Sequence, residues 1–84
     1  MILAAAAGRS EIARLLLGHG AQVDMTDRDG RTPLMLAVMR DNRALVEILL
    51  AHSAATGKAD AYGKTAPAYA REEGYSDLAA LLTR

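Results

Sequence analysis

Two short segments of this 84-residue sequence contain residue types that bind phosphate or metal ions. Gly63-Lys64-Thr65 resembles the end of a phosphate-binding loop, but Lys58 stands where that loop needs its first glycine. The acidic segment 24–30 resembles a calcium loop, but Met25 and Leu36 occupy the places of the first acid and the closing glutamate. We therefore expect neither nucleotide nor calcium binding.

The histidines and serines do not form a catalytic or metal-binding set. His19 and His52 are two ligands without a third, which is too few for a zinc site. The serines fall at expected breaks and turns, and the sequence gives none of them a positioned histidine and acid. There is no cysteine, which excludes disulfides and thiolate metal sites. We expect no catalytic residue, no cofactor and no metal.

Charge and hydropathy exclude two further classes of partner. The formal net charge is zero, whereas a nucleic-acid or anionic-membrane partner needs a basic face. No apolar segment approaches the roughly 20 residues that span a bilayer. The opening segment 1–7 lacks the positive residues of a signal peptide. We therefore expect a cytoplasmic or nuclear protein that binds neither nucleic acid nor membrane.

The sequence repeats at a fixed period. The segment GRTPLMLAV at 30–38 is followed 33 positions later by GKTAPAYAR at 63–71, and MILAA at 1–5 matches the same register. Paired leucines obey the same offset at Leu16, Leu49 and Leu82. A fixed period of this size indicates an array of stacked structural repeats.

Each unit reads as a turn, a short helix, a break and a longer helix. In the middle unit, 27–30 forms the turn, Thr32 caps the first helix and Pro33 occupies its first position. We expect helices over 34–40 and 44–53, separated by a break in which Asp41 can adopt the left-handed conformation. Neither helix can bury its apolar face alone, and stacking identical units solves that problem.

This pattern resembles the ankyrin repeat family, whose repeats contain a T-P-L turn segment, a central break and an apolar second helix. The middle unit matches at Asp27, Gly30, Thr32, Pro33, Leu34, Ala37, Leu45, Val46, Leu49 and Leu50. The first unit matches at Ala4, Ala5, Gly8, Glu11, Ile12, Leu15, Leu16, Gly20, Ala21 and Val23, and the last at Asp60, Gly63, Thr65, Ala70, Gly74, Asp77, Leu78, Leu81 and Leu82. The resemblance covers the whole chain in about two and a half repeats.

The resemblance implies an all-α ankyrin solenoid, in which antiparallel helix pairs are stacked and joined by β-turn or hairpin loops. We expect a single ankyrin repeat domain over 1–84. It would divide into a partial first repeat at 1–26, a full repeat at 27–59 and a C-terminal capping repeat at 60–84.

Four departures from the family pattern carry structural expectations. Met35 replaces the usual histidine, so the usual hydrogen bond between that histidine and Thr32 is absent. Asp41 replaces the break glycine, and the segment 53–57 lacks an apolar anchor, which would loosen that turn. Pro67 stands one place late, which would shift the start of the last short helix.

The two ends of the array differ in polarity. In the last unit Arg71 replaces Val38 and Thr83 replaces Leu50, as a closing cap requires. The first unit begins inside its first helix, where Ile2 and Ala5 suggest an apolar end face. Two interpretations stay open: preceding repeats belong there, or the face pairs with another chain, including a second copy.

Function must therefore lie in surface contacts. The resemblance implies that a protein or peptide partner binds the concave surface formed by the turn tips and the first helix of each unit. The residues carried over to that surface are Arg28, Asp29, Arg31, Met39, Arg40, Tyr62, Lys64, Glu72 and Glu73. Four of them are basic and the two glutamates lie at the far end, which would suit a partner with an acidic segment.

Three classes of function remain open. The chain is expected to be a non-catalytic protein-binding module. The alternatives are a structural or self-associating fragment of a longer ankyrin array, and a domain appended to an enzyme whose catalytic part lies elsewhere in the parent chain.

Overall fold

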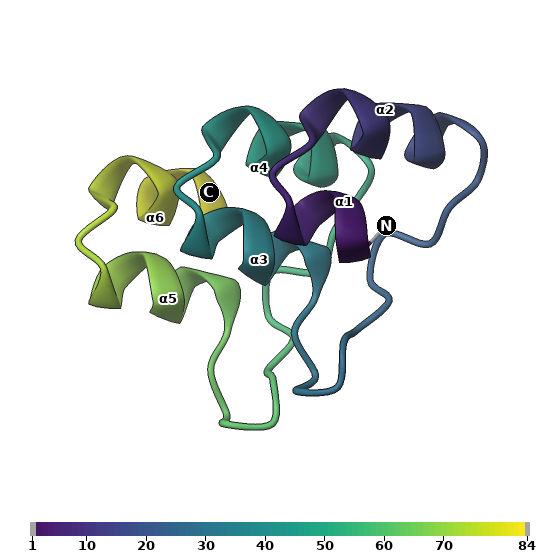
Figure 1. Cartoon of the computed structure of the whole chain (residues 1–84). Coiled ribbons are helices and arrows are strands. Elements are labelled where there is room, and N and C mark those ends of the chain that lie inside the picture. Colours follow the sequence, from purple (N-terminus) through teal and green to yellow (C-terminus); the bar gives the residue numbers. More distant parts are fainter. Residues whose placement is uncertain (1, 84) are drawn as a thin grey trace.

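The computed structural model describes residues 2–83 and contains three antiparallel helix pairs (Figure 1). The helices are α1 (Ile2–Ala6), α2 (Ser10–Gly18), α3 (Pro33–Met39), α4 (Arg43–Ala51), α5 (Ala66–Glu72) and α6 (Ser76–Leu82), and residues 2–83 contain no strand. The first helices of the three pairs, α1, α3 and α5, form one row, and the second helices, α2, α4 and α6, form another row above it in Figure 1. The predicted all-α stack of helix pairs is confirmed.

The middle pair supplies most of the buried core. Its fully buried side chains, none more than 1% exposed, are Leu34, Met35, Ala37, Val38, Leu45, Val46 and Leu49. Helix α3 packs against α1 on one side and α5 on the other, which explains this complete burial. The outer pairs bury one face each, as expected when every unit contacts only its neighbours.

The start of α3 shows how the missing histidine is replaced. The Thr32 hydroxyl accepts a hydrogen bond from the Met35 N–H at 3.2 Å, and Pro33 occupies the first helical position, as predicted. The Thr32 N–H donates to the Met35 sulfur at 3.5 Å. Sulfur is a weak acceptor, so Met35 supplies a weaker form of the contact that the sequence analysis expected to be lost.

The expected shift in the start of α5 is wrong. Helix α5 begins at Ala66, one repeat period after Pro33, and its cap is the Thr65 hydroxyl, which accepts from the Ala68 N–H at 3.3 Å. Pro67 falls within the first helical turn, where a backbone N–H has no partner inside the helix. A proline is therefore tolerated one place later, and the threonine cap fixes the start.

Two non-glycine residues occupy positions whose backbone conformation favours glycine. Asp41 ends α3 with φ of 53°, matching Gly8 and Gly74 in the other pairs, and Ser53 follows α4 with φ of 66°, matching Gly20. The predicted left-handed conformation of Asp41 is confirmed. The next residue, Asn42, caps α4 by accepting a hydrogen bond from the Leu45 N–H at 3.2 Å.

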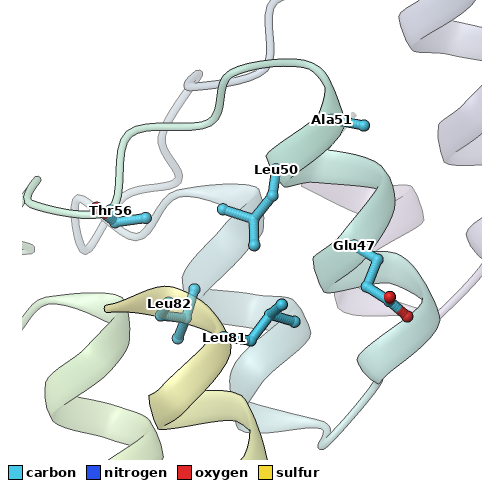
Figure 2. Close-up of a pocket in the computed structure, with 6 residues that line it drawn as sticks. All are labelled: Glu47, Leu50, Ala51, Thr56, Leu81 and Leu82. Atoms are coloured by element: carbon cyan, nitrogen blue, oxygen red, sulfur yellow. The ribbon is translucent and has the colours of Figure 1, made fainter. Parts of the chain in front are cut away.

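A hollow of about 470 Å³ lies between α4 and α6, on the row formed by the second helix of each pair. Figure 2 shows the side chains of Leu50, Leu81 and Leu82 converging on it, with Thr56 at one side. Thr56 stands one repeat period after Val23, which packs against the core below the first pair. The hollow therefore lies at the turn for which the sequence predicted the loss of an apolar anchor.

The two ends of the stack differ in polarity, as expected, but one residue predicted to lie on the apolar end face does not lie there. Arg71 and Thr83 are exposed on the last pair. Ala5, predicted to line the opposite end face, is 0% exposed because it packs within the core, so that prediction is wrong. Ile2 is half-buried, and Leu3, a large apolar residue of α1, is 84% exposed.

The described part of the chain shows neither a metal cluster nor a membrane span. His19 and His52 follow the last residues of α2 and α4 and are exposed. Within residues 2–83, the acidic and histidine side chains form no group of three or more able to hold a metal ion. Across the same residues, each helix is too short or too polar to cross a bilayer.

Candidate functional site

The two turns that precede α3 and α5 are built in the same way. The Asp27 carboxylate accepts hydrogen bonds from the N–H groups of Asp29 and Arg31, both at 2.9 Å. The Asp60 carboxylate accepts from the N–H groups of Tyr62 at 2.9 Å and Lys64 at 3.0 Å. Backbone bonds from Asp27 to Arg31 and from Asp60 to Lys64 close each turn as a hairpin. An aspartate at the first position therefore fixes both turn backbones.

The two turns are also joined to each other. The Ala61 N–H donates to the Asp29 carbonyl at 2.8 Å, so the turns lie side by side below α3 and α5 in Figure 1. Gly30 makes this approach possible. Its φ is +73°, and an added Cβ would lie 3.1 Å from the Ala61 nitrogen. The turns thus form one continuous surface.

A cluster of polar side chains connects this surface to α5. We call it the turn cluster, and its members are Asp29, Arg31, Asp60, Lys64, Tyr69 and Glu72. The Tyr69 hydroxyl donates to the Asp60 carboxylate. Lys64 Nζ lies 2.9 Å from a Glu72 carboxylate oxygen and 5.5 Å from the centre of the Tyr69 ring. Arg31 pairs with Asp29 at 3.5 Å.

Asp60 is the most buried charged residue of the turn cluster, at 8% exposed. Partial loss of water would raise the pKa of its carboxyl group. Hydrogen bonds from the Tyr69 hydroxyl and from the N–H groups of Lys64 and Tyr62, with the charge of Arg31, outweigh that effect and lower the pKa below its ordinary 3.8. Asp60 is therefore held as a carboxylate.

The same contacts set the state of two neighbouring groups. The hydrogen bond to Asp60, then partial burial, raises the pKa of the Tyr69 phenol above 10.0, so Tyr69 stays a donor. The hydrogen bond and charge of Glu72 raise the pKa of Lys64. Arg31 Nε is buried and has no hydrogen-bond partner within residues 2–83. The ion pairs of Arg31 with Asp29 and of Lys64 with Glu72, and the hydrogen bonds to Asp60, nevertheless compensate most charge of the turn cluster within the chain.

The structure brings together some of the predicted contact residues and separates others. Those that lie on the two turns or in the turn cluster are Arg28, Asp29, Arg31, Tyr62, Lys64 and Glu72. Met39 is 39% exposed and Glu73 is exposed, but within the described chain their side chains make no polar contact with the cluster.

Arg40 has a structural role that the sequence analysis did not predict. Its Nη1 donates to the Ala6 carbonyl at 2.9 Å, and its side chain lies against Gly8. Arg40 therefore holds the first helix pair to the second. Its guanidinium group satisfies a carbonyl at the end of α1, which limits its availability to a partner.

Sequence reasoning missed the roles of Asp60 and Tyr69 in the cluster. Asp60 was recognised as a turn residue, but its bond to a side chain of the following helix has no sequence signal. Tyr69 stands one repeat period after Leu36, in a partly buried position. A buried tyrosine hydroxyl needs a partner, and that rule could have pointed to an acid nearby.

The repeat geometry agrees with comparison to known families. A family model described as "Ankyrin repeats (3 copies)" matches residues 1–84. The chain belongs to the ankyrin repeat family. Ankyrin repeats are, in general, non-catalytic modules that bind other proteins.

Several curated proteins are similar to this ankyrin chain in sequence. It is 44% identical over 61 residues to "Ankyrin repeat and LEM domain-containing protein 1 homolog" of Caenorhabditis elegans, covering 73% of this chain and 9% of that protein. It is 37% identical over 81 residues to "Putative ankyrin repeat protein YahD" of Escherichia coli, covering 89% and 40%. It is 39% identical over 82 residues to human "Diacylglycerol kinase iota", covering 94% and 8%. The matched part of the chain thus spans 8–40% of the length of these relatives.

Proposed function

We propose that this ankyrin chain is a non-catalytic protein-binding module whose contact surface is formed by its two turns. The observation that carries the proposal is the position of Tyr62. Its side chain is 64% exposed, while its backbone N–H is held by Asp60 and the adjacent Ala61 is bonded to the preceding turn. An exposed tyrosine on a fixed backbone suits protein recognition, because little conformational freedom is lost on binding.

The charge of the surface narrows the kind of contact expected. Arg31 already pairs with Asp29, and Lys64 already pairs with Glu72. Arg28 is exposed at the tip of the first turn, and within residues 2–83 its side chain forms no ion pair. If the partner presents an acidic segment, as predicted, we expect Arg28 to meet it and Tyr62 to supply the apolar contact.

Other features of the proposal rest on the family alone. The partner is a peptide or a folded protein, and the location of this chain in the cytosol or nucleus stays a prediction. Met39 and Glu73, exposed at the end of α3 and after α5, would extend the contact surface beyond the turns. Arg40 contributes less, because its guanidinium group already serves the stack.

Paired affinity capture from a cell lysate tests the proposal. The first bait is the chain as written, and the second carries Arg28→Glu and Tyr62→Ala, which leave the turn cluster intact. A control bait carries Arg43→Glu on the exposed face of α4 and His52→Ala directly after that helix. Circular dichroism must show equal helicity for all three.

The proposal predicts a protein that the first and control baits retain and the turn variant loses. If all three baits retain the same proteins, the turns are not the contact surface. If the control loses the partner and the turn variant keeps it, the contact surface lies on the row of second helices, at α4.

A further inference from the structure

The hollow between α4 and α6 uncovers an apolar position that is covered in the preceding helix pair. Leu17 of the first pair is 7% exposed, whereas Leu50, one repeat period later, is only half-buried. Val23 packs against the core after the first pair, and Thr56 takes its place after the second. Part of the Leu50 side chain therefore stays in contact with water at a site that the stack does not fill.

The walls of the hollow are aliphatic, and one acidic group lies at its edge. The hollow is lined by Glu47, Leu50, Ala51, Thr56, Leu81 and Leu82. Figure 2 shows the three leucines between Thr56 on one side and Glu47 on the other. Among the described residues that line the hollow, Glu47 alone is charged. Its side chain is 56% exposed, so the carboxylate stays hydrated while the leucines form the floor.

Arg43 is the ion-pair partner of Glu47 along α4, but it leaves the carboxylate available. Arg43 Nε lies 3.7 Å from a Glu47 carboxylate oxygen, which is longer than a hydrogen bond. Both side chains are more than half exposed, and ion pairs of this kind contribute little free energy. A cation from a partner can therefore compete with Arg43 for the Glu47 carboxylate.

We propose that this hollow binds a lysine side chain of a partner protein. A lysine buries its methylene groups against apolar surface while its ammonium group stays in water. The methylene groups would lie against Leu50, Leu81 and Leu82, and the ammonium group would lie beside the Glu47 carboxylate. A neutral aliphatic side chain would gain nothing from Glu47, and an acidic side chain would be repelled by it.

This surface is separate from the two turns. The hollow lies on the row of second helices, whereas the turns lie below the row of first helices in Figure 1. Neither Arg28 nor Tyr62 lines the hollow. The inference therefore goes beyond the proposed function and does not depend on it.

A nuclear magnetic resonance titration with capped amino acids provides the test. The probe is N-acetyl-lysine amide. The matched probes are N-acetyl-norleucine amide, which has the same aliphatic chain without the charge, and N-acetyl-glutamate amide. Binding is followed through the backbone amide shifts of Leu50, Thr56 and Leu82. The ionic strength is held constant, because salt screens interactions between exposed charges.

Four variants separate the contributions of charge and shape. Glu47→Gln removes the carboxylate, and Arg43→Gln removes the competing cation. Thr56→Leu places a larger side chain at the edge of the hollow. Glu11→Gln is the matched control, because Glu11 is an exposed glutamate of α2 that lies 3.9 Å from Arg14 and does not line the hollow.

The expected result is a charge-selective site. The lysine probe should bind with a dissociation constant on the order of 10 mM, because it is small and the hollow is open to water. It should bind at least about twofold more tightly than the norleucine probe and about fivefold more tightly than the glutamate probe. Glu47→Gln should abolish the preference for the lysine probe over the norleucine probe, and Arg43→Gln should increase it. Glu11→Gln should leave it unchanged, and Thr56→Leu should weaken the binding of both probes.

Three results would overturn the inference. The first is a norleucine or glutamate probe that binds the natural chain as tightly as the lysine probe does. The second is an equal effect of Glu47→Gln and Glu11→Gln, since net charge would then account for the preference. The third is the absence of saturable shifts at the hollow, or shifts centred instead on exposed apolar residues such as Leu15.

Discussion

The hydroxyl of Tyr69 on α5 donates a hydrogen bond to the carboxylate of Asp60, the residue that opens the turn before that helix. The same carboxylate accepts two N–H groups of the turn. One buried acid therefore fixes the turn and ties it to the helix. Because the turn carries Tyr62, this arrangement prepares the proposed contact surface before a partner arrives.

Removing the Tyr69 hydroxyl should loosen this connection. We expect Tyr69→Phe to lower the melting temperature by about 4–8 °C, because a partly buried acid loses one of its three donors. Thermal unfolding followed by circular dichroism measures the shift. Tyr62→Phe is the control, since the exposed Tyr62 side chain makes no comparable bond in the described chain. Equal shifts in the two variants would show that the Tyr69–Asp60 bond contributes nothing.

The lowered pKa of Asp60 predicts acid sensitivity. A carboxyl group whose pKa is lower in the folded state stabilises the fold above its unfolded value, here 3.8, and loses that contribution as pH falls through the folded value. We expect the free energy of unfolding to decrease below about pH 4, and to do so less steeply in Asp60→Asn. Urea unfolding at a series of pH values gives both slopes. A variant slope as steep as that of the natural chain would assign the acid sensitivity to other carboxylates.

Ser53 holds a backbone conformation that costs less for glycine. Its φ is 66°, and Gly20 occupies the same position in the first pair. We expect Ser53→Gly to raise the free energy of unfolding by about 1 kcal/mol. Gly20→Ala is the reciprocal control: its φ is +90° with open space around it, so backbone strain alone should lower stability. A loss of stability in Ser53→Gly would mean that the serine side chain contributes more than its conformation costs.

The hollow between α4 and α6 should favour a methyl group in place of the Thr56 hydroxyl. We expect Thr56→Val to raise the free energy of unfolding by about 1 kcal/mol, because it restores the residue type of Val23 and faces Leu50, Leu81 and Leu82. Chemical unfolding measures the gain. Thr56→Ser should move stability in the opposite direction. No gain in the valine variant would mean that the hollow is too open to remove the added methyl from water.

The fold followed from the sequence because repetition gave the same information several times. Thr32 and Thr65 each signal a helix start, and the repeat period that separates them confirms each against the other. The wrong prediction of a shifted start for α5 relied on the position of Pro67 alone and not on the repeat period. The threonine cap determined the helix start, and the first turn tolerated the proline.

The candidate site was less predictable from the sequence than the fold, because it depends on contacts between repeats. The exposed position of Tyr62 on a turn was predictable from its place in the unit. The roles of Asp60, Tyr69 and Arg40 were not, because each depends on how closely neighbouring units approach. The prediction that Ala5 lies on the end face was wrong for the same reason. Periodicity identifies an apolar helix face, but it does not show whether that face points into the core or toward the end of the stack.

Isothermal titration calorimetry of a captured partner with the purified chain tests directly whether the two turns form the binding surface. We expect one partner per chain and at least about tenfold weaker binding for Tyr62→Ala, with the Arg43→Glu, His52→Ala variant within about twofold of the natural chain. Undiminished binding by Tyr62→Ala, together with a marked loss in the α4 variant, would contradict the claim that the turns form the binding surface.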